Sequence, residues 1–360
     1  MSTEVVRSTS RTPTILNEML PFRYEMRGRR GGIVGVGIAI SCRLGQSFAP
    51  PPPPPLLSYH SFRLEFARRF ATEIDTDADA EQTEQHHLRF SGVGRLYSSG
   101  TSPNAHLDIV DKLAASTCAV FGIGGVGTWA AEALCRSGVG NLILVDMDEI
   151  CISNVNRQLH ATTSTIGKSK IHEMERRLLD INPNINTTTI FDFVTLDNID
   201  EMMDLLPPDC VVLDCIDGQR EKAALIVACY ERGMSVVTCG GAAGRRDPTK
   251  IVCDDLTNAQ EDRLLFRCRK LLRKEYDWPK GPAQGEKNNH KVKPWGIPAV
   301  FSTEIQKSVD QSGTAGSLRR CDGALGTACF LTGTYGFVAA SRVIDMIAED
   351  KRMIPAKPNR

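Results

Sequence analysis

One stretch of the sequence, residues 118–148, constrains the fold more than any other. It begins with a short apolar run at residues 118–123, and a run of this length bounded by glycine favours a buried strand. Residues 129–136 are good helix formers, and a second apolar run, 142–145, ends on Asp146. Between the first run and the helix, four glycines have the spacing G-x-G-x-x-G: Gly122, Gly124, Gly125 and Gly127. This order predicts a strand–helix–strand unit that binds a nucleotide.

Each part of this unit has a physical reason to contact a nucleotide. The glycines let the backbone approach phosphate, and the helix N-terminus offers free N–H groups with a partial positive charge. Asp146, at the end of the second strand, can accept hydrogen bonds from ribose hydroxyls. The motif does not distinguish NAD, FAD and ATP, and a tight strand-to-helix turn without a ligand is the simplest alternative.

The beginning of the chain differs in composition from the rest. The 360 residues carry 43 basic and 43 acidic side chains, so no overall field argues for nucleic acid. Residues 1–85 combine many arginines with no lysine, a proline run at 50–55 and an acidic tract at 73–84. Arg-rich leaders are typical of organelle transit peptides, so we expect a disordered targeting segment for the mitochondrion or another organelle. A cytoplasmic protein with a disordered tail is the alternative.

Strands and helices alternate after the leader. We expect the folded part to begin at residue 88, and the nucleotide-binding unit to be followed by these elements: helix 170–181, strand 187–193, strand 211–217, helix 220–232 and strand 235–238. A helix at 104–115 precedes the unit. Such alternation predicts an α/β fold with a doubly wound, Rossmann-like, mostly parallel sheet that helices cover on both faces.

The pattern changes beyond residue 244. The sequence there indicates a smaller C-terminal α+β extension with four elements: strand 251–253, a basic helix 260–276, strand 300–305 and a closing helix within 323–348. The closing helix is rich in small residues and interrupted by polar ones, which favours a buried or interface helix over a membrane span.

Polar residues gather where strands end, at the edge where doubly wound sheets place their ligands. The first connection carries Asp148, Asn154, Arg157, Gln158 and Lys170, and Asp217 follows a later strand. Two cations and an acid beside a phosphate turn exceed what a dinucleotide requires. They suit triphosphate chemistry, in which cations stabilise charge on phosphate and a carboxylate holds Mg²⁺. The alternatives are solvated cations at helix starts and an aspartate that caps a helix.

Several motifs together resemble a known superfamily. GIGGVG, LVDMD, SNVNRQ, GKSK and DCID resemble the adenylyltransferase domain of the ThiF/MoeB-type, ubiquitin-activating superfamily. Over residues 89–350, RF-x4-RLY, DMDEICISNVNRQLHA, TCGGAAGRRDPTKI and VFSTE resemble the tRNA threonylcarbamoyladenosine dehydratase family. The resemblance implies an adenylation domain at 88–350, with a nucleotide-binding part at 88–244 and a part for substrate and dimer contacts at 245–350.

The resemblance also implies site residues for ATP and Mg²⁺. Gly125 would lie on the ATP phosphates and Asp146 on the ribose, while Arg157 and Lys170 would hold the triphosphate. Arg95 would reach across a homodimer to the partner's ATP. Asp217 would act in catalysis and hold the metal, and the further nucleotide-binding positions would be Gly122, Gly124, Gly127, Asp148, Asn154, Gln158 and Gly218.

The reaction implied by the resemblance is an ATP-dependent cyclisation on tRNA. The threonyl carboxylate of N6-threonylcarbamoyladenosine, next to the anticodon, would become an acyl adenylate with release of pyrophosphate. The neighbouring ureido nitrogen would then expel AMP and close a hydantoin-type ring. Because the attack is intramolecular, no protein nucleophile is required.

Other functions are kept open. An adenylyltransferase for a ubiquitin-like or sulfur-carrier protein would need zinc and a transfer cysteine, but none of the 12 cysteines forms CxxC, so no structural zinc is expected. Bacterial members often have a cysteine where Ala299 stands. Cys239 and Cys321 are the candidate reactive thiols by position, although burial is the simpler interpretation. A sulfur-relay partner, a non-catalytic tRNA-binding protein and an NAD oxidoreductase are further possibilities.

A basic segment offers a surface for tRNA. Residues 263–293 hold ten basic residues against three acids. Apolar residues at 264, 265, 268, 271 and 272 form a helical stripe, so the cations are expected on the opposite face. An ordinary solvated helix surface is the alternative. With tRNA as the implied substrate, Arg269, Arg273 and Lys274 are expected to contact phosphates without reading sequence.

Overall fold

The computed structural model describes residues 76–99, 103–279, 293–305 and 325–356, with side chains from residue 81 onward. It also describes the backbone of two short strands, β1 (Phe22–Glu25) and β2 (Val34–Gly37), which pair antiparallel. The chain divides into two units, Met1–Glu65 and Phe66–Arg360, which we describe separately. The remainder of the expected leader up to residue 75 lies outside the described residues, and its targeting role stays a prediction.

Seven strands of the second unit form one sheet in the described part of the chain, in the order β5-β4-β3-β6-β7-β9-β8. All neighbouring pairs are parallel except β8 and β9. The strands are β3 (Thr117–Phe121), β4 (Asn141–Val145), β5 (Asn186–Ile190), β6 (Val211–Asp214), β7 (Ser235–Cys239), β8 (Ile251–Asp255) and β9 (Pro298–Ser302). The expected doubly wound, mostly parallel α/β sheet is confirmed, and its C-terminal extension adds β8 and β9 to the same sheet.

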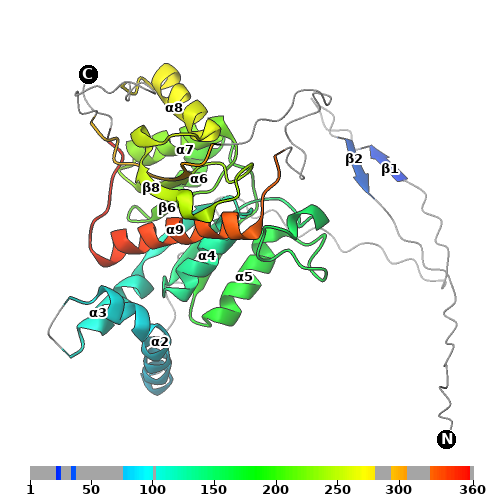
Figure 1. The fold of residues 1–360 in the computed structure, drawn as a ribbon. Helices are drawn as coiled ribbons and strands as arrows, with labels where there is room; N and C mark the ends of the chain where they lie inside the picture. Colours follow the sequence, from blue (N-terminus) through cyan, green and yellow to red (C-terminus); the bar gives the residue numbers. More distant parts are fainter. Residues whose placement is uncertain are drawn as a thin grey trace, which may run out of the picture. The chain divides into compact units, whose positions relative to one another are not determined.

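Two layers of helices cover this sheet (Figure 1). Helix α4 packs on both α5 and the long α9, and α7 packs on both α6 and α8. The bounds are α2 (Thr76–Tyr97), α3 (Ala105–Ala115), α4 (Gly127–Arg136), α5 (Lys170–Ile181), α6 (Ile199–Asp204), α7 (Gln219–Glu231), α8 (Arg263–Glu275) and α9 (Cys329–Ala348). Single 3-10 turns form at η1 (Ile152–Asn154), η2 (Pro248–Lys250) and η3 (Leu256–Asn258). None of the described helices is both long and apolar enough to cross a membrane.

The order of strands defines one switch point. From β3 the chain winds outward through β4 to β5, and it then crosses to β6 on the other side of β3. At such a point the loops after the two central strands diverge and leave a crevice, where open α/β sheets bind ligands. Gly122 directly follows β3, and the Cys215 N–H that follows β6 donates to the Phe121 carbonyl over 2.9 Å. The glycine motif therefore lies at the switch point.

The folded part begins earlier than the sequence indicated. Helix α2 starts at Thr76, so the expected boundary at residues 85–88 falls inside a helix. Residues 76–84 of the acidic tract form the start of this helix, where the helix dipole favours negative charge. Phe90 is buried against Gly138, and the backbone of Gly94 approaches the His106 carbonyl of α3 so closely that a Cβ would lie 2.2 Å from it. These contacts attach α2 to the rest of the second unit.

Candidate active site

The turn after β3 has a backbone that requires glycine at two positions. Gly122 has a φ of +88°, in the left-handed region. A Cβ on Gly127 would lie 1.9 Å from the Gly122 carbonyl oxygen, so a side chain there would force the turn open. Near the Cβ position of Gly124 the closest described atom is Gln158 Nε2, at 4.0 Å. The backbone is therefore open at Gly124, beside the N-terminus of α4, as a phosphate site requires.

Asp146 ties the end of β4 to this turn. Its Oδ2 accepts the Ile123 N–H over 2.8 Å, and its Oδ1 accepts the Asp148 N–H over 2.8 Å. Burial raises the pKa of Asp146, and the nearby Lys170 and the two backbone N–H groups oppose that shift. Each carboxylate oxygen has a second lone pair, so Asp146 can still accept from a ribose hydroxyl. The residue thus has a structural role in addition to the expected nucleotide contact.

Lys170 places a nearly buried cation beside the turn. It is the first residue of α5, and its Nζ lies 2.6 Å from Asp148 Oδ2 and 4.0 Å from Asp146 Oδ1. The Lys170 side chain is 7% exposed, whereas that of Asp148 is 50% exposed. Because Asp148 is the exposed member of the pair, it is the partner that an incoming phosphate can replace. The structure therefore brings Lys170, Asp146 and Asp148 together as the sequence indicated.

The connection after β4 is shaped from inside by Asn154. This residue is buried, and its Oδ1 accepts the Cys151 N–H over 2.9 Å. Its carbonyl accepts the N–H groups of Arg157 and Gln158, over 3.0 and 2.9 Å. Asn154, which we expected on the nucleotide, thus uses its carboxamide oxygen to fold the connection and turns the following residues toward the glycine turn.

Arg157 is held at its backbone from two sides. Its carbonyl accepts the Trp129 Nε1–H and the Thr332 hydroxyl, each over 3.0 Å. The Cγ of Arg157 lies 3.6 Å from the Cβ position of Gly125, so the side chain runs along the turn. Its Nη1 donates to the Ser153 carbonyl. Sequence motifs found Arg157 but not Trp129 or Thr332, which act through their side-chain donors.

Two buried polar atoms of this connection lack a hydrogen-bond partner within the described residues. They are Gln158 Oε1 and His160 Nδ1. The other ring nitrogen of His160 lies 3.2 Å from the Ile123 carbonyl oxygen, and burial lowers the pKa of His160 to about 4. Buried polar atoms are rarely left unpaired, so an unpaired acceptor beside Gly124 indicates a place for a ligand or water. The residues present therefore fit a bound nucleotide.

The loop after β6 separates two aspartates. Asp214 is fully buried and accepts Lys222 Nζ and Thr238 Oγ1, each over 2.7 Å. Its other oxygen accepts the Ile216 N–H over 3.1 Å, which orients the loop. Asp217, three residues on, is exposed at the carboxyl edge of the sheet. The buried group of Asp214, Lys222 and Thr238 was not identified from the sequence. One sign of it was available: Asp214, the first acid of DCID, stands inside an apolar run, where a carboxylate needs a buried partner.

Gly218 has a local structural role in addition to its expected place in the site. It is the N-cap of α7, and a Cβ there would lie 2.3 Å from Glu221 Oε2. That oxygen is the end of a flexible side chain, so the contact does not by itself require glycine at the helix start. Any contact of Gly218 with the nucleotide would come from its backbone.

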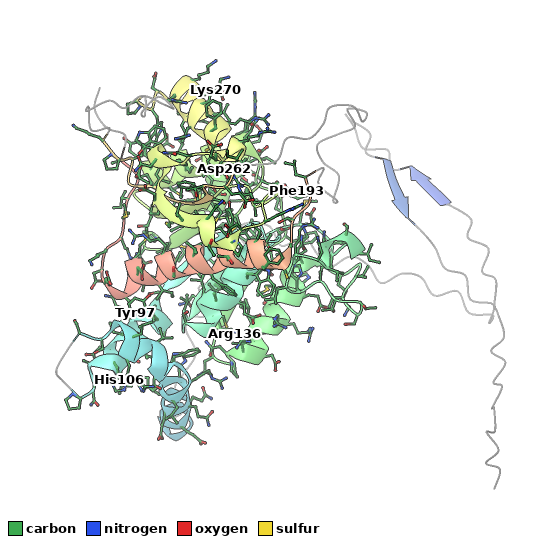
Figure 2. The ribbon with its side chains drawn as sticks, in the orientation of Figure 1. Tyr97, His106, Arg136, Phe193, Asp262 and Lys270 are labelled. Atoms are coloured by element: carbon green, nitrogen blue, oxygen red, sulfur yellow. The ribbon has the colours of Figure 1, made fainter. Side chains whose placement is uncertain are left out.

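Arg95 is the one expected catalytic residue that the fold does not bring to this crevice. It is exposed in the last turn of α2, and Tyr97, two residues on, donates through its hydroxyl to Asp345 Oδ1 over 2.7 Å. Asp345 is 13 residues along α9 from Thr332. At the rise of an α-helix this separation is about 20 Å. Figure 2 shows Tyr97 with His106 on the α2–α3 side of the unit.

The basic helix α8 has the expected apolar stripe but a different set of free cations. Leu265, Cys268 and Leu272 are buried, as expected. Arg269 was expected on the solvent face, and this is wrong: its Nη1 donates to the Thr257 carbonyl over 2.8 Å, and burial lowers its pKa. Arg273 Nε donates to the carbonyl of Arg269. Both guanidinium groups thus donate to backbone carbonyls of the protein. Residues 280–292 of the basic segment lie outside the described residues.

The candidate thiols give no support for a reactive cysteine. Cys239 is buried at the end of β7, and a hydrogen bond that its thiol donates to Cys215, together with burial, raises its pKa. A thiol with a raised pKa is a poor nucleophile. Cys321 lies outside the described residues. Within the described residues no three His, Cys, Asp or Glu side chains gather as a metal site.

A Rossmann-like sheet with a phosphate turn, two cations and an acid at its switch point defines a nucleotide-binding class. The chain belongs to the ThiF family, because the sequence model of that family matches residues 97–356. Within that family it belongs to the tRNA threonylcarbamoyladenosine dehydratases. The dehydratase of Haemophilus influenzae is 38% identical over 270 residues, which cover 74% of this chain and 96% of the relative.

Solved structures give the same result. The crystal structure of the Escherichia coli tRNA N6-threonylcarbamoyladenosine dehydratase in complex with ATP has a TM-score of 0.62 and 34% identity, and the match covers 78% of this chain and 98% of the other. By contrast, the ubiquitin-like modifier-activating enzyme 5 of Xenopus laevis is 28% identical over a match that covers 47% of this chain and 48% of the relative. The similarity to protein-activating enzymes is therefore the weaker one.

Proposed function

We propose that this chain is an ATP-dependent tRNA threonylcarbamoyladenosine dehydratase. The observation that carries the proposal is the fixed position of Arg157 along the glycine turn: its Cγ lies 3.6 Å from the Cβ position of Gly125, and its carbonyl is held by two side chains. A guanidinium group at this position can stabilise charge that develops on phosphate oxygens during adenylation. Hydride transfer from a dinucleotide develops no charge on phosphate, so that reaction does not need a guanidinium group for this purpose.

The residues around the turn support binding of the whole triphosphate. The backbone N–H groups at the start of α4 would receive phosphate oxygens, and Lys170 would gain them as partners in place of the exposed Asp148. Asp146 would accept from the ribose. The unpaired Oε1 of Gln158 provides a buried acceptor on the same side of the turn.

A Mg²⁺ ion fits the donors that are present. Asp217 offers an exposed carboxylate at the carboxyl end of β6, and Mg²⁺ in nucleotide sites commonly uses one or two carboxylates with phosphates and waters as its remaining ligands. The lack of a larger acidic cluster among the described residues is compatible with this arrangement. When bound, the ion would neutralise phosphate charge.

The chemistry then follows in two balanced steps. An oxygen of the threonyl carboxylate attacks the α-phosphorus of ATP, and the bond to the pyrophosphate group breaks. The ureido nitrogen next attacks the acyl carbon, loses its proton and expels AMP, which closes the ring. Arg157 and Lys170 act on the first step by stabilising charge on the phosphates, and proximity within the substrate drives the second.

Mass analysis of tRNA nucleosides tests this proposal directly. Full-length protein, ATP, Mg²⁺ and tRNA that carries threonylcarbamoyladenosine are incubated, and the tRNA is digested under mild conditions. The expected product is 18 Da lighter than the substrate nucleoside, by the loss of one water as in a cyclisation. An unchanged nucleoside, together with adenylation of a ubiquitin-like or sulfur-carrier protein, would assign the chain to the protein-activating alternative.

Three further parts of the proposal depend on other observations. A homodimer is supported by Arg95, which is exposed far from its own crevice, and by the exposed Leu96 and Phe337. The small residues of α9 do not support it, because Gly336 packs on Trp129 of the same chain. A sulfur-relay protein partner has only the family resemblance behind it. The Arg-rich residues 1–85 support a location in an organelle. Imaging of this segment fused to a fluorescent protein would test that location.

A further inference from the structure

Helix α8 carries a narrow strip of exposed cations. Arg263, Arg267, Lys270 and Lys274 are all exposed, whereas the apolar stripe of the helix is buried. Successive residues of an α-helix are about 100° apart, so the spacing of four, three and four residues puts these side chains within about 60° of arc. Their rise along the helix is about 16 Å. The strip faces away from the core.

The cations of this strip have no acid as a partner within the described residues, since none of the ion pairs found there includes them. An aromatic ring joins the strip. Phe266 precedes Arg267 and stands four residues before Lys270, and it is 47% exposed. Free cations in a row beside an exposed aromatic ring are the combination with which proteins bind phosphates and stack unpaired bases.

The strip is anchored to the edge of the sheet that holds the active site. Asp262 is the N-cap of α8: its Oδ1 accepts the Leu265 N–H, and its Oδ2 accepts the Gly241 N–H, each over 2.9 Å. Arg245 lies 3.4 Å from the same carboxylate and donates to the carbonyl of Gly241. Both charged side chains are 1% exposed. Figure 2 shows Asp262 at the inner end of α8 and Lys270 farther out.

This anchoring matters because Gly241 follows β7, which is parallel to β3. The carboxyl ends of the two strands lie at the same edge of the sheet. Helix α8 therefore starts at the sheet edge where the glycine turn lies, and its later residues are farther from that edge. Arg269, underneath the strip, fixes the helix further by its bond to the Thr257 carbonyl. A firmly held cationic strip thus starts at the edge of the sheet that holds the crevice and runs along α7.

We propose that this strip of α8 docks the phosphate backbone of the tRNA, and that Phe266 stacks on an unpaired base beside it. The inference rests on the proposed function, which supplies a polyanionic substrate too large for the crevice. RNA fits better than an acidic protein, because a stable protein interface needs an apolar centre and this strip offers a single ring. Contacts of this kind position the substrate without reading its sequence.

The test compares two charge-matched variants of the full-length protein. In the strip variant, Arg267→Gln, Lys270→Gln and Lys274→Gln remove three charges while glutamine preserves helix propensity. In the control variant, Arg136→Gln, Arg176→Gln and Lys351→Gln also remove three charges. These side chains lie elsewhere on the surface and are 57, 72 and 73% exposed. Binding of tRNA is measured over a series of KCl concentrations, together with ATP affinity, thermal unfolding and nucleoside conversion.

The strip variant is expected to bind tRNA at least tenfold more weakly at low salt, and its slope of log Kd against log salt should fall by about two to three. ATP affinity and thermal unfolding should equal those of the wild type. Phe266→Ser should weaken binding about fivefold or more without changing the slope.

Two results would overturn the inference alone while the wild type still converts tRNA. One is an unchanged tRNA affinity and salt slope in the strip variant, which would show that the strip does not bind tRNA. The other is an equal loss in the control variant, which would mean that net charge and not the strip decides binding. If the wild-type protein neither binds nor converts tRNA, the proposed function is wrong, and the proposal that α8 docks tRNA is wrong as well.

Discussion

The side-chain hydroxyl of Thr332 donates a hydrogen bond to the backbone carbonyl of Arg157, with the two oxygens 3.0 Å apart. The methyl group of Thr332 also faces the phosphate turn, since its Cγ2 lies 3.0 Å from the Cβ position of Gly125. The first turn of α9 therefore sets both the glycine turn and the connection that carries Arg157. A helix near the end of the chain thus holds in place the arginine that we propose to act on the ATP phosphates.

Thr332→Val should weaken this support without creating a cavity, because valine has the same shape and lacks the hydroxyl. A lost hydrogen bond of this kind costs about 1 kcal/mol, so the ATP KM should rise and kcat fall by a combined factor of about five to ten. Thr332→Ser should restore activity. Thr334→Val is the matched control, since that hydroxyl is exposed and donates to the Phe330 carbonyl of its own helix. Equal kinetics in the two valine variants would contradict the positioning role.

The expected elements were found where the pattern is local. The apolar run and glycines around Gly122 fix a strand and turn within a few residues, and helix α5 begins at Lys170 and ends at Ile181 as its signals indicated. Thr332 had no such signal, because it meets Arg157 across 175 residues of chain. The long sequence separation of the two partners is the reason that the sequence alone did not reveal the contact.

Side-chain orientation was also beyond the sequence. DCID contains two acids, and only the fold shows that Asp214 is buried against Lys222 while Asp217 is exposed. On α8 the helical period placed Leu265 and Leu272 inside as expected. It did not show that Arg269, at the border of the stripe, turns to the carbonyl of Thr257, because that carbonyl belongs to another element.

Asp217→Asn should reduce adenylation by impairing metal binding. The neutral amide is a weaker ligand for Mg²⁺ than a carboxylate, so the Mg²⁺ concentration for half-maximal rate should rise about tenfold or more. Excess Mg²⁺ should recover part of the rate, while the ATP KM at saturating metal changes little. Asp180→Asn, at an exposed position on α5, serves as the control. An unchanged Mg²⁺ dependence in Asp217→Asn would remove this residue from the metal site.

The buried pair of Lys222 and Asp214 should respond asymmetrically to mutation. Lys222→Met leaves the Asp214 charge buried without its cation and should cost about 3–5 kcal/mol of unfolding free energy. Adding Asp214→Asn removes that isolated charge, so the double variant should recover part of the loss in chemical denaturation. Single and double variants of equal stability would show that Asp214 is not charged in the native protein.

His160 should make the protein less stable in acid. Burial lowers its pKa to about 4 from an ordinary value of 6.5, so the folded state favours the neutral ring. Its contribution is fully present above pH 6.5 and is lost as pH falls toward 4, by up to about 1.4 kcal/mol per pH unit. His160→Gln should flatten this part of the stability profile, whereas His172→Gln on the exposed face of α5 should not. Parallel profiles for the His160 variant and wild type would contradict this assignment.

Arg157→Ala alone should lower the adenylation rate by about 10² to 10³, because one charge on the phosphates is lost while the core is untouched. Arg95→Ala should also be inactive if Arg95 completes the site of a partner subunit. In its own subunit Arg95 stands two residues before Tyr97, whose hydroxyl bonds to Asp345, and Asp345 is about 20 Å along α9 from Thr332 at the crevice. Action within one chain would therefore require α2 to leave its contact with α9.

Mixing the two inactive variants separates action within a chain from action across a dimer. In a mixed dimer the subunit with Arg95→Ala keeps its Arg157 and receives Arg95 from its partner, which restores one complete site. Random exchange of equal amounts makes about half of the dimers mixed, so about a quarter of wild-type activity should return. Two variants that carry the same substitution recover nothing and give the baseline. Mixed dimers that form, as shown by differently tagged subunits, yet stay at this baseline would show that Arg95 does not act in the partner's site.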